Sequence, residues 1–139
     1  MSGLPETAAA LIDDFDLFDD WEDRYAYLID LGKQLPAMPE SERTDENKVR
    51  GCMSQVWFVQ RAGGDRLVWQ GDSDAVIVRG LIAVLQVLYG SVTRVDALQV
   101  DVEGVFDRLG LKNHLSMNRR NGFFSMVTRL RSYAGQSPA

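Results

Sequence analysis

The sequence predicts an α+β domain in which helices pack on a three-stranded antiparallel sheet. Apolar residues recur at helical spacing in the first third of the chain and again toward its end. Between these parts lie three short runs rich in β-branched and aromatic residues, separated by turn-forming segments. A length of 139 residues fits one compact domain and hardly two, so we expect a single domain over residues 1–139.

The N-terminal third is predicted to hold two helices and a loop. "PETAAALIDDF" (5–15) begins with a proline and an acid, both suited to a first helical turn. A second helix is favoured because apolar residues form one inward-facing stripe, namely Trp21, Tyr25, Leu28 and Leu31. The polar segment 36–50 contains two prolines and is interpreted as a long loop with one helical turn in "PESER".

The middle of the chain is predicted to form the sheet. "SQVWFVQR" (54–61) is the first strand, "AGGD" (62–65) is a tight turn and "RLVWQ" (66–70) is the second strand. "GDSD" (71–74) is interpreted as a second turn. "AVIV" (75–78) could be a strand or a helix start, and its dense β-branching favours the third strand.

The remainder is predicted to be helical. "RGLIAVLQVLYG" (79–90) is apolar nearly all round, which indicates a buried helix closed by Gly90. Thr93 is expected to cap a short helix, and Gly110 to end the next. "NRRNGFFSMVTRLRSY" (118–133) is expected to form an amphipathic final helix.

Composition excludes several classes of function. The chain is 45% hydrophobic and 25% charged, and no uncharged apolar run is long enough to span a membrane. Its start turns acidic at once and does not resemble a signal peptide, so a cytoplasmic location is expected. One Cys and one His allow no internal disulfide and no four-ligand zinc site, so we expect neither a metal nor a cofactor.

Charge is distributed unevenly along the chain. Residues 1–47 carry 13 acidic and 3 basic side chains, a net charge of −10, whereas residues 48–139 carry 7 acidic and 12 basic, a net charge of +5. This asymmetry indicates either an oriented surface for another protein or a merely solvated exterior. Nucleic acid is not expected as a partner, because no Lys/Arg cluster is dense enough to follow phosphates.

The lone cysteine, Cys52, is the candidate reactive group. It follows the long polar loop and Gly51, at a place where backbone is commonly exposed. It could be an inert, buried small hydrophobe in a non-catalytic interaction domain. It could be a nucleophile with His114 as its base in a cysteine hydrolase. It could be a sulfur carrier, which needs only a thiolate and access. A redox switch is disfavoured because the chain has no resolving cysteine.

Four blocks of sequence, in order along the chain, resemble the SufE family of sulfur acceptors, which includes CsdE. "NKVRGCMSQVWF" (47–58) is similar to the family signature Asn-x-Val-x-Gly-Cys-x-Ser-x-Val-Trp. "WEDRYAYLIDLGKQLP" (21–36) resembles its N-terminal helix segment. "GDSDAVIVRGLIAVL" (71–85) resembles the following turn and helix, and "HLSMNRRNGF" (114–123) the C-terminal His-Leu-x-x-x-Arg-x-x-Gly segment.

The resemblance implies a fold like that of IscU-type scaffolds and a persulfide carried on Cys52. The sulfur would come from a pyridoxal-phosphate cysteine desulfurase of the SufS type, which the carrier stimulates, and would pass to a SufBCD-type scaffold. Pyridoxal phosphate would belong to the partner. A CsdE-like role with a different acceptor stays open, and we expect a monomer or a weak homodimer.

The resemblance also implies residues that meet the partner, namely Arg50, Gly51, Met53, Asp74 and Arg119. By position, Arg119 matches a C-terminal arginine of the family, and Asp74 lies in the matching turn. The ordinary alternatives are a turn residue for Asp74 and a first-turn surface charge for Arg119. Met53 replaces a commonly polar residue after the cysteine, and Arg50 occupies a variable position.

Overall fold

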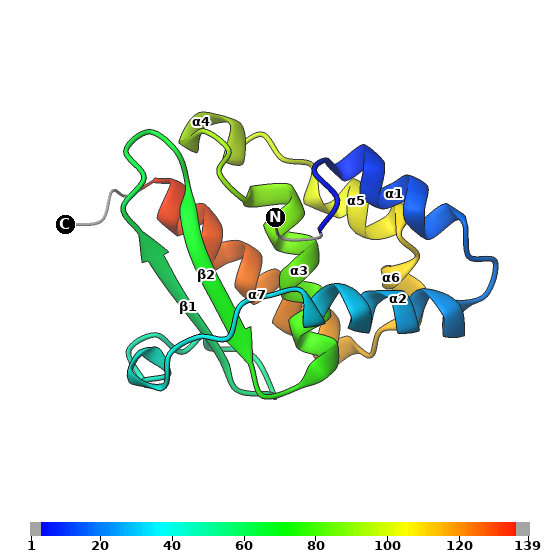
Figure 1. Ribbon diagram of the computed structural model, residues 1–139, viewed down its shortest axis with the longest axis horizontal. Coiled ribbons are helices and arrows are strands. Elements are labelled where there is room, and N and C mark those ends of the chain that lie inside the picture. Colours follow the sequence, from blue (N-terminus) through cyan, green and yellow to red (C-terminus); the bar gives the residue numbers. More distant parts are fainter. Residues whose placement is uncertain (1–3, 136–139) are drawn as a thin grey trace.

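A computed structural model describes residues 4–135 (Figure 1). Two strands, β1 and β2, lie against long helices at one end of the molecule, and most of the other helices gather at the far end. The elements in chain order are α1 (Ala8–Asp16), α2 (Trp21–Lys33), the 3₁₀ turn η1 (Glu40–Glu42), β1 (Val56–Arg61), β2 (Val68–Ser73), α3 (Val76–Tyr89), α4 (Arg94–Ala97), α5 (Val102–Arg108), α6 (Leu111–His114) and α7 (Met117–Ala134). The predicted α+β class is confirmed.

Within residues 4–135 the sheet has two strands, not the three expected. β1 and β2 pair antiparallel, with a register running from Val56 opposite Ser73 to Arg61 opposite Val68. On the other edge of β1 the described part of the chain makes only an isolated bridge, between Lys48 and Trp57. Lys48 lies in the segment that was interpreted as a polar loop, where no β-branched pattern predicted pairing with β1.

The predicted third strand, residues 75–78, is wrong because α3 already begins at Val76. Ala75 is extended and its N–H donates to Ser73 Oγ at 3.2 Å, so the chain turns there from strand into helix. Ile77 and Val78 are buried on the helix, whereas Val76 is exposed, and the burial of the first two outweighs their local preference for a strand. The "GDSD" turn is also wrong, because residues 71–73 complete β2.

The core is built around α3, which crosses the centre of the molecule while α7 runs behind the sheet (Figure 1). Most of α3 is buried, as its nearly uniform apolar sequence predicts. Gly90 ends it, and Thr93 Oγ1 accepts from Asp96 N at 3.0 Å to cap α4, so both predictions are confirmed. No helix within residues 4–135 is long and apolar enough to cross a membrane.

The stripe predicted for α2 is confirmed only in part. Leu28 and Leu31 are buried against the core, whereas Tyr25 is exposed and Trp21 is half-buried. The helix packs on α3 through glycines: a Cβ on Gly80 would lie 2.5 Å from the Leu28 carbonyl oxygen, and one on Gly32 would lie 2.6 Å from Gly80 N. Both helices therefore need a hydrogen in place of a methyl group at their closest approach.

We expect Gly80→Ala to lower the free energy of unfolding by about 1–2 kcal/mol, since the cost of overpacking exceeds the gain in helix propensity. Denaturant unfolding measures the change. Gly135→Ala is the matched control, because its Cβ would meet backbone oxygens at ordinary distances of 3.7 and 3.8 Å. A Gly80→Ala protein as stable as wild type would contradict the close helix contact.

Candidate functional site

The cysteine lies on a short segment, residues 50–54, which we call the Cys loop. Its N-terminal stem is fixed by backbone bonds to β1: Val49 N donates to Val56 O at 2.8 Å, and Phe58 N donates to Asn47 O at 2.9 Å. Arg129 of α7 donates from Nη2 to the Lys48 carbonyl oxygen at 2.7 Å. This stem is therefore held by both the sheet and the final helix.

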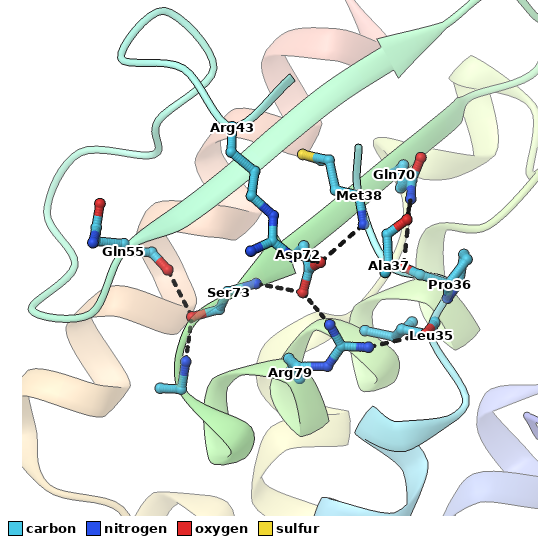
Figure 2. A network of polar contacts seen from close by, with 11 residues as sticks. Leu35, Pro36, Ala37, Met38, Arg43, Gln55, Gln70, Asp72, Ser73 and Arg79 are labelled. Atoms are coloured by element: carbon cyan, nitrogen blue, oxygen red, sulfur yellow. Dashed lines mark hydrogen bonds and ion pairs between the residues drawn. The ribbon is translucent and has the colours of Figure 1, made fainter. Parts of the chain in front are cut away.

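The C-terminal stem of the Cys loop is fixed through Gln55. Its N–H donates to Asp74 Oδ1 at 3.1 Å, and its carbonyl oxygen accepts from Ser73 Oγ at 2.7 Å. Figure 2 shows Gln55 reaching the Ser73 hydroxyl. The end of β2 thus holds the loop where it joins β1, so Asp74 acts on this stem and lies outside the lining of the thiol cavity described below.

A buried carboxylate supports this end of β2. Asp72 is fully buried, and each of its oxygens accepts two hydrogen bonds (Figure 2). Oδ1 accepts from Ser73 N at 2.8 Å and from Arg79 Nη1, while Oδ2 accepts from Met38 N at 3.0 Å and Arg43 Nη2 at 2.8 Å. Two arginines from different segments therefore neutralise one buried charge, which is the arrangement that a buried ion requires.

The Cys loop packs closely against small residues of α7. Gly51 has φ +88°, a left-handed conformation that favours glycine, and a Cβ there would lie 2.5 Å from Ser125 Oγ. Cys52 Sγ lies 3.6 Å from the Gly122 carbonyl oxygen, which can accept from the thiol. A Cβ on Gly122 would lie 3.5 Å from Sγ, so the helix backbone closely approaches the sulfur.

The thiol lies at a small cavity between the Cys loop, α3 and the first turns of α7. The cavity measures about 210 Å³ and is lined by Cys52, Met53, Ser54, Val56, Val78, Leu81, Ser116, Asn118, Arg119, Gly122, Phe123 and Met126. Cys52 is half-buried, and this burial raises the pKa of its thiol above the ordinary value. The resting thiol is therefore sheltered and protonated at neutral pH.

The structure brings some predicted site residues together and separates others. Arg119 and Met53 line the same cavity as Cys52, and the Met53 side chain is also 82% exposed. Arg50 is exposed and borders a neighbouring hollow next to Ser125 and Arg129. The cavity thus combines a sheltered sulfur, an apolar rim residue and one guanidinium.

His114 does not join this site. Its ring stacks on Trp21, with centroids 4.5 Å apart and planes at 8°. It is absent from the cavity lining, and no hydrogen bond links it to Cys52 within the described residues. The Cys–His alternative therefore lacks the contact between nucleophile and base that it requires.

Sequence reasoning missed four residues that position the thiol: Asp72, Ser73, Gly122 and Ser125. The first two were interpreted as a turn, and their roles depend on partners distant in the chain. Small residues at 122 and 125, three apart on one helix face, could have indicated close backbone contact. Within residues 4–135, no group of three or more His, Cys, Asp or Glu side chains could hold a metal ion.

Similarity to known proteins extends over most of the chain. The sequence model of the SufE family, described as an Fe-S metabolism associated domain, matches residues 9–134. An uncharacterised SufE-like protein of Rhizobium meliloti is 48% identical over 134 residues, covering 93% of this chain and 96% of the relative. One of Rhizobium etli is 48% identical over 128 residues, covering 89% and 86%.

A solved structure shares the fold. The solution structure of a hypothetical protein from Thermus thermophilus superposes with a TM-score of 0.75, at 16% identity, covering 95% of this chain and 96% of that one. At this identity the likeness shows the fold alone. From the sequence matches, the chain belongs to the SufE family, whose domain is associated with iron–sulfur metabolism.

Proposed function

We propose that the protein is a sulfur acceptor and activator for a pyridoxal-phosphate cysteine desulfurase of the SufS type. Cys52 receives a sulfane sulfur as a persulfide and passes it on to a SufBCD-type scaffold for iron–sulfur cluster assembly. The protein acts as an accessory carrier, and pyridoxal phosphate belongs to the desulfurase. Membership of a family associated with iron–sulfur metabolism supports this choice of pathway.

One observation carries the proposal: the lone thiol sits at a cavity large enough for another sulfur atom, on a short loop held at both stems. A carrier has to accept sulfur and then shelter it from stray thiols. Five loop residues between fixed stems can move without disturbing the sheet, and the cavity provides the shelter. A carrier needs no second cysteine and no base of its own.

The transfer step is a thiol–disulfide-type exchange without net redox change. The Cys52 thiolate attacks the outer sulfur of the donor persulfide, and a new S–S bond forms. The S–S bond to the donor cysteine breaks, and that cysteine leaves as a thiolate. The proton given up by Cys52 balances the charge by protonating the departing donor. Burial raises the thiol pKa in the resting protein, so leaving the cavity favours the attacking anion.

The direct test is a Cys52→Ser variant assayed with a SufS-type desulfurase and cysteine. We expect wild-type protein to stimulate sulfide release and the variant to lose this stimulation, because the serine hydroxyl cannot hold a sulfane sulfur. Intact mass spectrometry should show a gain of about 32 Da, one sulfur atom, on the wild-type cysteine alone. Stimulation by Cys52→Ser equal to that by wild type would reject the carrier function.

Binding of the variant provides the control for this test. Cys52→Ser should still bind the desulfurase, since one atom changes and the stems of the loop stay in place. A variant that neither binds nor stimulates would indicate a docking defect, and the mass measurement on wild-type protein would then decide the question. Absence of the added sulfur on wild-type Cys52 after incubation also rejects the proposal.

A further inference from the structure

We propose that Arg119 is the counter-ion of the persulfide anion on Cys52, an inference that rests on the proposed carrier function. The role concerns the loaded protein away from any partner. It assigns to the cavity a preference for charged cargo over the empty thiol. Three features of the described residues lead to it: the charge of the lining, an unpaired buried nitrogen and the space beyond the sulfur.

Arg119 is the only charged residue in the cavity lining as the structure describes it, over residues 4–135. The Cys loop contributes Met53 and Ser54, α3 contributes Val78 and Leu81, and α7 otherwise contributes neutral side chains. The nearest other cations along the chain lie elsewhere: Arg50 borders a different hollow, and Lys48 pairs with Asp45 at 3.8 Å. An anion in this cavity would therefore meet one positive charge.

The guanidinium of Arg119 has an unused donor. Its Nη1 is shielded from solvent and has no hydrogen-bond partner within the part of the chain that the structure describes. A buried, unsatisfied N–H is costly, and native proteins rarely leave one without a reason. Arg119 lines the cavity, so a turn of its guanidinium toward an anionic acceptor there would satisfy this N–H, and charge-assisted hydrogen bonds are stronger than neutral ones.

The outer sulfur of a persulfide fits the cavity in size and carries a charge opposite to that of Arg119. An S–S bond extends the side chain by about 2 Å, so the outer sulfur can occupy space beyond Sγ. A persulfide is a stronger acid than the parent thiol and is anionic at neutral pH. The empty thiol stays protonated, because burial raises its pKa. Negative charge therefore arrives with the sulfur, and Arg119 distinguishes the loaded carrier from the empty one.

The test loads Cys52 without any partner. Inorganic disulfide ion, HSS⁻, reacts with the Cys52 thiol to give the persulfide and hydrosulfide, with one S–S bond broken and one formed. The pH dependence of alkylation, followed by intact mass, then gives the titration midpoint of the persulfide. In Arg119→Gln this midpoint should rise by about one pH unit, since an opposite charge within a few ångströms lowers an acid's pKa by one unit or more.

Two variants separate a counter-ion from a merely structural role. Arg119→Lys keeps the charge and should keep most of the wild-type midpoint. Arg120→Gln removes the adjacent arginine, which borders a different hollow, and should leave the midpoint unchanged. The thiol midpoint of the unloaded protein should move less than the persulfide midpoint in Arg119→Gln. Circular dichroism checks that every variant is folded.

The proposal is overturned if the persulfide midpoint of Arg119→Gln equals that of wild type. It is also overturned if Arg120→Gln shifts the midpoint equally, or if thiol and persulfide midpoints shift by the same amount. Because loading uses an inorganic donor, these results are independent of the desulfurase. Failure of a desulfurase to load Cys52 would reject the carrier function and leave the measured role of Arg119 intact.

Discussion

Replacing Asp72 with alanine is expected to lower the free energy of unfolding by about 3 kcal/mol. This is the lower end of the range for breaking a buried ion pair, because the partner guanidiniums can recover some hydration. The Arg43 and Arg79 side chains are 33% and 21% exposed, whereas that of Asp72 is 0% exposed. The substitution leaves two arginines and the Met38 and Ser73 N–H groups without their acceptor.

Urea unfolding of Asp72→Ala beside Asp30→Ala measures this effect. Asp30 and Lys33 form an exposed pair at 3.7 Å, with 67% and 71% of their side chains exposed, so Asp30→Ala should have little effect on stability. Since Asp72 immediately precedes the residues that hold Gln55, Asp72→Ala should also speed alkylation of Cys52. A loss of stability no larger than that of Asp30→Ala would show that the buried network contributes nothing specific.

Gly51→Ala is expected to displace the Cys loop from its contact with α7. The left-handed conformation costs a non-glycine residue about 1–2 kcal/mol, and the new Cβ would also collide with Ser125 Oγ. A Cys loop displaced from α7 exposes Cys52 to water. Burial raises the thiol pKa in the wild type, so exposure lowers it toward the ordinary value. The alkylation midpoint should therefore move to lower pH, with several-fold faster reaction at neutral pH.

Gly64→Ala is the matched control for Gly51→Ala. Gly64 has φ +63°, but a Cβ there would meet nothing within 4 Å, so it shares the backbone strain and lacks the collision. Gly64→Ala should lower the free energy of unfolding and leave the pH dependence of Cys52 alkylation unchanged. In the double variant Gly51→Ala/Ser125→Gly, the collision is removed and part of the wild-type profile should return. An unaltered pH dependence of Cys52 alkylation in Gly51→Ala would mean that packing of the Cys loop on α7 does not control the thiol pKa.

Local patterns in the sequence predicted the helices better than the sheet. Residues 75–78 were ambiguous because dense β-branching suits a strand, whereas the apolar run that follows suits a buried helix that could begin there. The helix formed because α2 and α7 both pack on it, which no local pattern reveals. Pairing of residues 47–49 with β1 was missed because it uses backbone groups, and the side chains there look like those of a loop.

The sequence led to a candidate residue for the site and not to the geometry around it. The position of Cys52 after a glycine, together with the four family-like blocks, made it the candidate reactive group. Asp74 was assigned to the partner surface by resemblance, and the structure gives it a bond to Gln55. Asp72 was missed because a buried carboxylate can be recognised only when its arginines, from segments 29 and 7 residues away, are seen beside it.

The two stems of the Cys loop set a limit on how far the sulfur can travel. Residue 49 is fixed to β1, and Cys52 is the third residue after it, so the tether spans about 10 Å when fully extended. An enzyme that buries its own sulfur deeper than this cannot be reached by the loop alone. Under the proposed carrier function, the donor enzyme therefore has to offer its sulfur near the mouth of its active site or bring it outward on a mobile arm.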